Sequence, residues 1–64
     1  MSFRGIDAYS FGPLAAMYRA IAGGQVLRFK HEDAESVAVK MAQKGFDVRI
    51  DKYVQYGFST VRLR

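Results

Sequence analysis

The hydrophobic residues of this chain first recur at a helical spacing. Positions i, i+3, i+4 and i+7 carry one apolar stripe, made of Leu14, Met17, Tyr18 and Ile21. This stripe predicts a helix over residues 13–22, in which Pro13 suits the first turn and Ser10 or Gly12 caps the start. Because Arg19 is its only charge, we expect this helix to be nearly surrounded by the domain or to contact another chain.

A second apolar stripe predicts a helix over residues 34–44. The stripe consists of Ala34, Val37, Ala38, Met41 and Ala42. Asp33 is the expected N-cap, and Gly45 fits the left-handed position after the last turn. Lys40 and Lys44 lie near the C-terminal end, where positive charge is favourable to the helix dipole.

Three other runs alternate between apolar and polar residues, which is the period of a strand with one buried face. They cover residues 25–31, 46–51 and 58–64. Alternation directs six side chains toward the core: Leu27, Phe29, Val48, Ile50, Val61 and Leu63. Strict alternation places Phe58 on the outward side, unless a bulge near Gly57 reverses it.

The resulting order is α, β, α, β, β. A strand, a helix and a strand in close succession favour a right-handed parallel crossover, and the last two strands favour an antiparallel hairpin. We therefore expect one small α+β domain over residues 1–64, with a three-stranded mixed sheet and both helices packed on one face. Residues 2–9 stay unassigned, because Phe3 and Ile6 are spaced too irregularly to decide on a short edge strand.

Length and composition exclude several classes of protein. A chain of 64 residues buries only about 60% of the surface that it exposes when unfolded, which leaves little room for an enclosed active site. The absence of Cys excludes a disulfide framework, thiolate catalysis and Cys-based zinc sites. Residues 1–5 lack the long apolar core of a secretory signal, so we expect none, and the longest weakly polar stretch, residues 11–22, is too short for a bilayer. We expect a cytoplasmic protein without a membrane partner.

Residues with catalytic or metal-binding chemistry do not form a recognisable site. His31 has three acidic neighbours in the sequence, Glu32, Asp33 and Glu35, but side chains at a strand end and a helix start point apart. The hydroxyl groups of the chain have no identifiable base partner; they belong to Ser10, Ser36, Ser59 and Thr60. The sequence therefore predicts no enzyme, no metal, no cofactor and no small-molecule substrate.

Positive charge gathers on one side of the predicted sheet. The net charge is +4, and alternation turns five cations away from the helices together with Thr60: Arg28, Lys30, Arg49, Arg62 and Arg64. Tyr53 and Tyr56 lie at the rim of this side or on the hairpin. Cations neutralise phosphates and rings stack unpaired bases, so the pattern favours a small basic module that binds single-stranded RNA or DNA. Asp47 and Asp51 share this side and can pair across strands with Arg28, Lys30 or Arg62, which is the ordinary alternative.

A second functional hypothesis is a small protein-interaction factor, an adaptor or inhibitor of the phage type. It would act by homodimerisation or by binding a target protein through the first helix or a sheet edge. Its candidate contacts are the residues of the first apolar stripe, Leu14, Met17, Tyr18 and Ile21. An exposed edge strand such as residues 58–64 is the other candidate, because it can pair with its twin.

Overall fold

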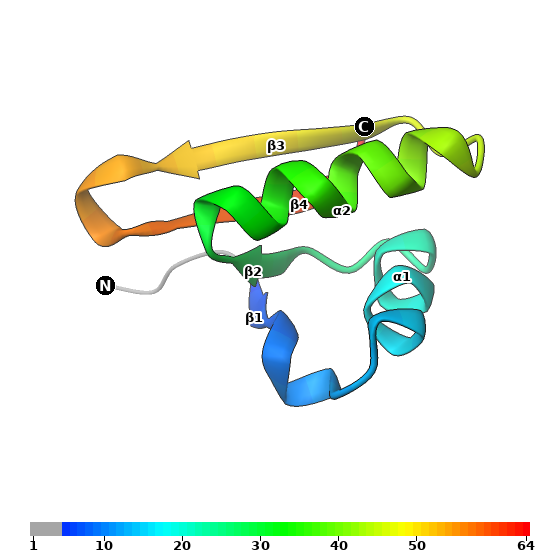
Figure 1. The fold of residues 1–64 in the computed structure, drawn as a ribbon, viewed down its shortest axis with the longest axis horizontal. Helices are drawn as coiled ribbons and strands as arrows, with labels where there is room; N and C mark the ends of the chain where they lie inside the picture. Colours follow the sequence, from blue (N-terminus) through cyan, green and yellow to red (C-terminus); the bar gives the residue numbers. More distant parts are fainter. Residues whose placement is uncertain (1–4) are drawn as a thin grey trace.

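Two helices cover one face of a four-stranded sheet in the computed structural model, which describes residues 5–64 (Figure 1). Along the chain the elements are β1 (Ile6–Asp7), the 3-10 turn η1 (Ala8–Phe11), α1 (Leu14–Ala22), β2 (Leu27–Phe29), α2 (His31–Gln43), β3 (Val48–Tyr53), the 3-10 turn η2 (Val54–Tyr56) and β4 (Phe58–Leu63). The α+β class is confirmed. The sheet has four strands instead of the predicted three, because β1 forms an edge strand within the segment 2–9 that was left unassigned. Of the two apolar residues considered there, Ile6 lies in β1, and Phe3 lies outside the described residues.

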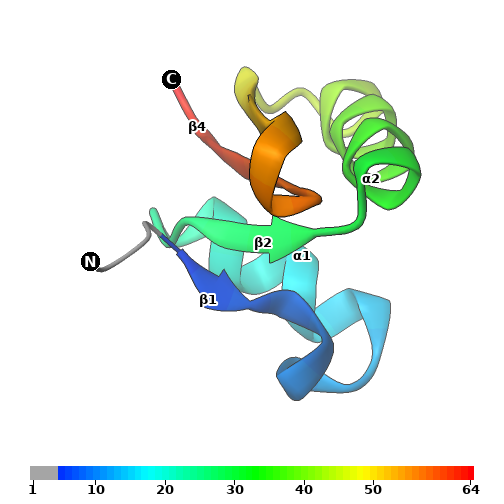
Figure 2. The same cartoon turned by 90° about the vertical axis from the view of Figure 1, so that its left-hand side faces the viewer.

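The strand order is β1-β2-β4-β3, so the last strand of the sequence lies inside the sheet. β1 is parallel to β2, as Figure 2 shows, and β4 is antiparallel to both of its neighbours. The predicted β3–β4 hairpin is confirmed. The predicted crossover between β2 and β3 is corrected in one respect: these strands run parallel, but β4 lies between them, which makes a split β-α-β unit.

Helix α1 begins one residue later than expected and has a different start. Pro13 occupies the N-cap position and makes no side-chain hydrogen bond there, so neither Ser10 nor Gly12 is the cap. The Ser10 hydroxyl instead donates to the backbone carbonyl of Asp7, 2.7 Å away, within the turn before the helix. The side chain that could have capped α1 is therefore used to close η1.

Helix α2 begins three residues earlier than expected, at His31, with Lys30 as its N-cap. Asp33 lies inside the first turn, where its carboxylate accepts a hydrogen bond from the hydroxyl of Tyr9. Acidic side chains in a first turn stabilise a helix through its dipole whether or not they cap it. The start of α2 is consequently fixed by the short β2–α2 connection and by Tyr9.

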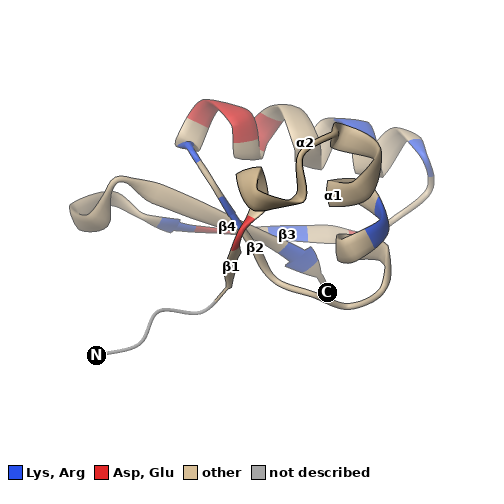
Figure 3. Cartoon of the chain, turned by 90° about the horizontal axis from the view of Figure 1, so that it is seen from below, with Lys and Arg blue, Asp and Glu red and all other residues tan. Residues whose placement is uncertain are grey.

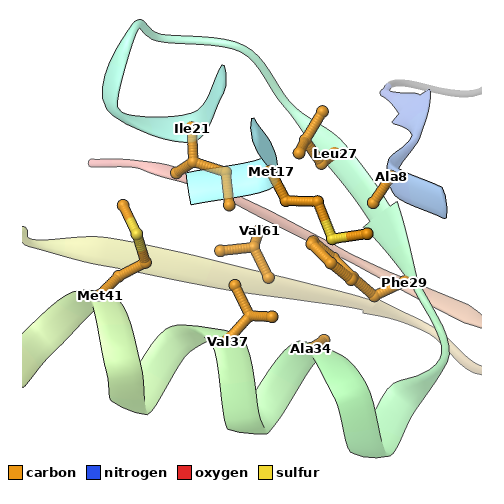
Figure 4. Packing of buried hydrophobic residues seen from close by; sticks show 9 residues of the cluster. All are labelled: Ala8, Met17, Ile21, Leu27, Phe29, Ala34, Val37, Met41 and Val61. Carbon is orange, nitrogen blue, oxygen red and sulfur yellow. The ribbon is translucent and has the colours of Figure 1, made fainter. Parts of the chain in front are cut away.

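The core lies between the helices and the helix-facing side of the sheet. Figure 4 shows side chains of α1 and α2 converging on Val61 in β4. The buried hydrophobic residues are Ala8, Met17, Ile21, Leu27, Phe29, Ala34, Val37, Met41 and Val61. Of the side chains expected to face inward, Ile50 has the helix-facing register but is 37% exposed, because β3 is an edge strand. The expected core residue Ala42 is exposed on α2.

Candidate functional site

Strand register determines which side chains share the sheet face that points away from the helices. Val61 is in the core, so its chain neighbours in β4, Thr60 and Arg62, point to the opposite face. The other outward positions of β2, β3 and β4 share that direction and complete what we call the basic face, with Asp7 of β1 beside Arg28 at its border: Arg28, Arg49, Asp51, Tyr53, Phe58, Thr60 and Arg62. Figure 3 shows basic positions on the strands beneath the helices, with acidic colour on β1 beside them and more at the start of α2.

The arginines on this face and at its end differ in their partners. Arg49 Nε lies 2.9 Å from Asp51 Oδ1 on the same strand, and Arg64 Nε lies 3.0 Å from Asp47 Oδ1 beyond the end of the ladder. Asp51 therefore pairs along its own strand and Asp47 pairs across strands with Arg64. Both acids offset part of the positive charge, as the alternative expected, although neither pairs with Arg28, Lys30 or Arg62. Arg62 lies directly opposite Arg49, and two like charges in this position repel each other.

Arg28 occupies a crowded position on the basic face. Its guanidinium carbon lies 5.7 Å from the ring centre of Phe58, within the range of a cation–π contact. Arg28 Nε and the neighbouring Thr60 Oγ1 are buried, and neither has a hydrogen-bond partner among residues 5–64. Thr60, expected to face outward, is directed away from the helices but is only 1% exposed. Unpaired buried polar atoms of this kind are costly in a folded protein.

Aromatic rings gather at the hairpin end of the basic face. The ring centres of Tyr53 and Phe58 lie 5.2 Å apart with planes tilted by 32°, and those of Tyr56 and Phe58 lie 6.3 Å apart at 28°. The pairing of β3 with β4 runs without a bulge to Tyr53 opposite Phe58, so the outward position of Phe58 is confirmed. Tyr53 ends β3 and Tyr56 lies in η2, where it is 42% exposed.

Lys30 lies outside the sheet, at the N-cap of α2, yet it stays close to the basic face. Together with Arg28, Phe58 and Asp7 it lines an open hollow of about 260 Å³. Tyr9 also borders this hollow; its hydroxyl donates to Asp33 Oδ2 at 2.5 Å and accepts the Lys30 backbone N–H at 3.0 Å. Burial and the hydrogen bond to Asp33 raise the pKa of Tyr9 above its usual 10.0. No local pattern could indicate this contact, because Tyr9 and Asp33 are distant along the chain.

One hydroxyl has a base partner that the sequence did not indicate. Nδ1 of His31 lies 2.6 Å from the hydroxyl oxygen of Ser59, which corrects the expectation that Ser59 has no such partner. Ser59 is 1% exposed on the helix-facing side of β4, so a substrate cannot reach its oxygen. The contact satisfies a buried hydroxyl and joins the start of α2 to the sheet. Between residues 5 and 64 no three His, Asp or Glu side chains come together as metal ligands.

The alternative contact residues on α1 are separated by the fold. Met17 and Ile21 belong to the core and are not available to a partner, whereas Leu14 is 55% exposed. Tyr18 is partly buried, and the ammonium nitrogen of Lys44 lies 5.5 Å from its ring centre. Residues 58–64 were also expected to form an exposed edge strand, and this expectation is wrong because β4 is an inner strand. No helix in the described part of the chain is long and apolar enough to cross a bilayer.

No protein-family model, curated protein or solved structure matches this chain. Its function is therefore argued from the geometry of its own residues. Of the predicted nucleic-acid contacts, the basic face unites Arg28, Arg49, Arg62 and Tyr53, with Lys30 and Tyr56 at its border. Arg64 continues the same side of β4 one position past the ladder's last pair and is held by Asp47.

Proposed function

We propose that this chain is a small, non-enzymatic module that binds single-stranded RNA or DNA across its basic face. The observation that carries the proposal is the arrangement of three arginines beside the rings. Arg62 and Arg49 are opposed as like charges, and Arg28 has a buried Nε without a partner in the described chain. An anion relieves the like-charge opposition and supplies the ion-pair partner that Arg28 lacks among residues 5–64, and phosphate oxygens accept hydrogen bonds from guanidinium groups in a favourable geometry.

The order of side chains along β4 supports a polynucleotide rather than a single small anion. Phe58, with Tyr53 opposite, lies four residues before Arg62, a separation of about 13 Å at about 3.3 Å per residue. Stacking groups at one end and cations at the other match a strand whose bases and phosphates alternate. The face is also wide enough for several contacts, because three strands contribute to it.

Binding of this kind depends strongly on salt. The cations of the site without an ion-pair partner among residues 5–64 are Arg28, Lys30 and Arg62. Release of counterions from a single strand gives a slope of log K against log salt of about −0.7 per neutralised phosphate, so three contacts give about −2. Arg49 and Arg64 add less, because Asp51 and Asp47 already offset their charge.

The test is a fluorescence anisotropy titration of labelled single-stranded RNA and DNA pools at several salt concentrations. We expect Arg62→Glu to weaken binding at least about tenfold and to flatten the salt slope. Lys40→Glu is the matched control, because it makes the same change of charge at an exposed position of α2 and should alter binding little. Equal effects of the two variants, or no binding to either pool at low salt, would overturn the proposal.

The contribution of stacking is separated from charge with a second pair of variants. Tyr56→Ala removes an exposed ring at the border of the basic face and should weaken binding about fivefold or more. Tyr56→Phe keeps the ring and should bind like the wild type. A different outcome is that the protein does not bind nucleic acid but binds a target protein, and that Leu14→Asp abolishes this binding. That outcome would establish the protein-interaction hypothesis instead.

A further inference from the structure

The outer edge of β3 carries a further inference. β3 ends the strand order β1-β2-β4-β3, and no strand among residues 5–64 pairs with its outer side. The N–H of Arg64 donates to the carbonyl of Asp47 at 3.1 Å, which places residue 47 in a hydrogen-bonded pair. Alternation along an antiparallel ladder then turns the backbone groups of Val48, Ile50 and Lys52 outward. An edge with such a row of donors and acceptors is a template for another strand.

β3 lacks several of the features that protect an edge strand from pairing, although three of its six residues are charged. It contains no Pro, it is six residues long, and it pairs with β4 without a bulge from Val48 to Tyr53. Its one lysine, Lys52, lies next to the last position of the strand. The long aliphatic stem of Lys52 can cover an apolar neighbour while its charge stays in water. The edge is therefore regular enough to accept a partner strand along its whole length.

We infer that the partner is a second copy of this chain, paired antiparallel through β3 with Ile50 opposite Ile50 of the second copy. In this register Arg49 faces Asp51 of the second copy, and Asp51 faces Arg49 of the second copy, so two opposite-charge pairs form. If each strand shifts by one residue, Arg49 faces Arg49 of the second copy, or Asp51 faces Asp51 of the second copy. Like charges then lie opposite each other, which is unfavourable. The charges of β3 thus select a self-complementary pairing, as a two-fold interface requires.

The helix-facing side of the same edge has Ile50 at its centre, between Val48 and Lys52. Ile50 is 37% exposed there. Ala34, Val37 and Met41 of α2 point into the core, and Ser36 and Lys40 line a cavity of about 240 Å³ against α1.

Ala38 and Ala42 consequently lie on the opposite flank of α2, toward β3. Ala42 is exposed although its side chain is apolar. A two-fold axis through the Ile50 pair, perpendicular to the sheet, brings this flank of α2 toward its copy. The small side chains permit close approach of the two helices, and the pairing would extend the sheet to eight strands with both basic faces on one side.

A single introduced thiol tests the register, because the chain contains no Cys. In the Ile50→Cys variant the two thiols face each other across a hydrogen-bonded pair, with Cα atoms about 5.5 Å apart, which is within disulfide range. We expect oxidised glutathione to convert this variant to a covalent dimer. Lys52→Cys is the matched control: its two thiols would be at least about 13 Å apart along the strands and should not cross-link. Equal cross-linking of both variants, or none of Ile50→Cys, would overturn the inference.

Sedimentation equilibrium of the full chain tests the charge pairs without any cross-link. Arg49→Asp and Asp51→Arg each create two like-charge oppositions in a homodimer, so each variant alone should dimerise at least about tenfold more weakly than the wild type. Mixed together they restore both opposite-charge pairs and should form a heterodimer. A wild type that stays monomeric at high concentration, or a mixture no tighter than its components, would refute the pairing. These measurements contain no nucleic acid, so their outcome is independent of the proposed function.

Discussion

Of all valine-to-alanine substitutions in this chain, Val61→Ala should lower the free energy of unfolding most. Val61 is fully buried on an inner strand, with Leu27 and Ile50 opposite it on the two neighbouring strands. Each buried carbon contributes about 0.8 kcal/mol, and the cavity that remains adds a further penalty, so the cost is about 2–3 kcal/mol. A domain of this size has a total unfolding free energy of about 3–10 kcal/mol, and the melting temperature should fall by about 10–20 °C.

The matched control is Val39→Ala, which removes the same atoms from a residue of α2 that is 57% exposed. Ala has the higher helix propensity, so this variant should differ from the wild type by less than about 0.5 kcal/mol. Urea unfolding followed by circular dichroism measures both free energies. If the two variants were equally stable, β4 would not be the inner strand that the core is built on, and the strand order would be wrong.

Three further predictions concern local features. Gly57→Ala should lower the free energy of unfolding by about 1 kcal/mol, because φ is 78° and the added Cβ meets no other atom. Gly5→Ala should lower it more, because φ is 102° and the added Cβ would lie 3.0 Å from a side-chain atom of Arg28. Equal losses of unfolding free energy, measured in urea, would contradict this. The difference in absorbance titration between wild type and Tyr9→Phe should have its midpoint above pH 10.0, because burial raises the pKa of Tyr9. Its contribution to stability is then present below pH 10 and lost as pH rises through the folded pKa, and a midpoint at or below 10.0 would oppose this reasoning. Ser59→Ala should cost about 1 kcal/mol, and His31→Ala should add little to it; additive losses would show that the 2.6 Å contact is not shared.

The local elements of this fold were predictable because their signals lie within a few residues of each other. Alternation around Val61 and the helical spacing of Val37 and Met41 located β4 and α2 and identified their buried sides. The order of strands was not predictable in this way. Alternation shows which side of a strand is buried but not which strand lies beside it, and the insertion of β4 between β2 and β3 is a property of the whole sheet.

In the candidate site, too, features with a local sequence signal were predictable and contacts between distant residues were not. The common direction of Arg28, Arg49 and Arg62 follows from alternation, and the register agrees with it. Contacts between distant residues gave no local signal. Asp33 was expected to cap α2, and its use by the hydroxyl of Tyr9 could be seen only in three dimensions.

The inner position of β4 has a consequence for synthesis. A ribosome releases β1, α1, β2, α2 and β3 before residues 58–63, and until then the pairing within the described chain is limited to the two residues of β1 with β2. The apolar sides of both helices have no complete sheet to cover them during that interval. Most strand pairing requires β4, which is synthesised after the other elements, so we expect the chain to fold in a single late step. Until that step occurs, we expect the nascent chain to be accessible to chaperones and proteases.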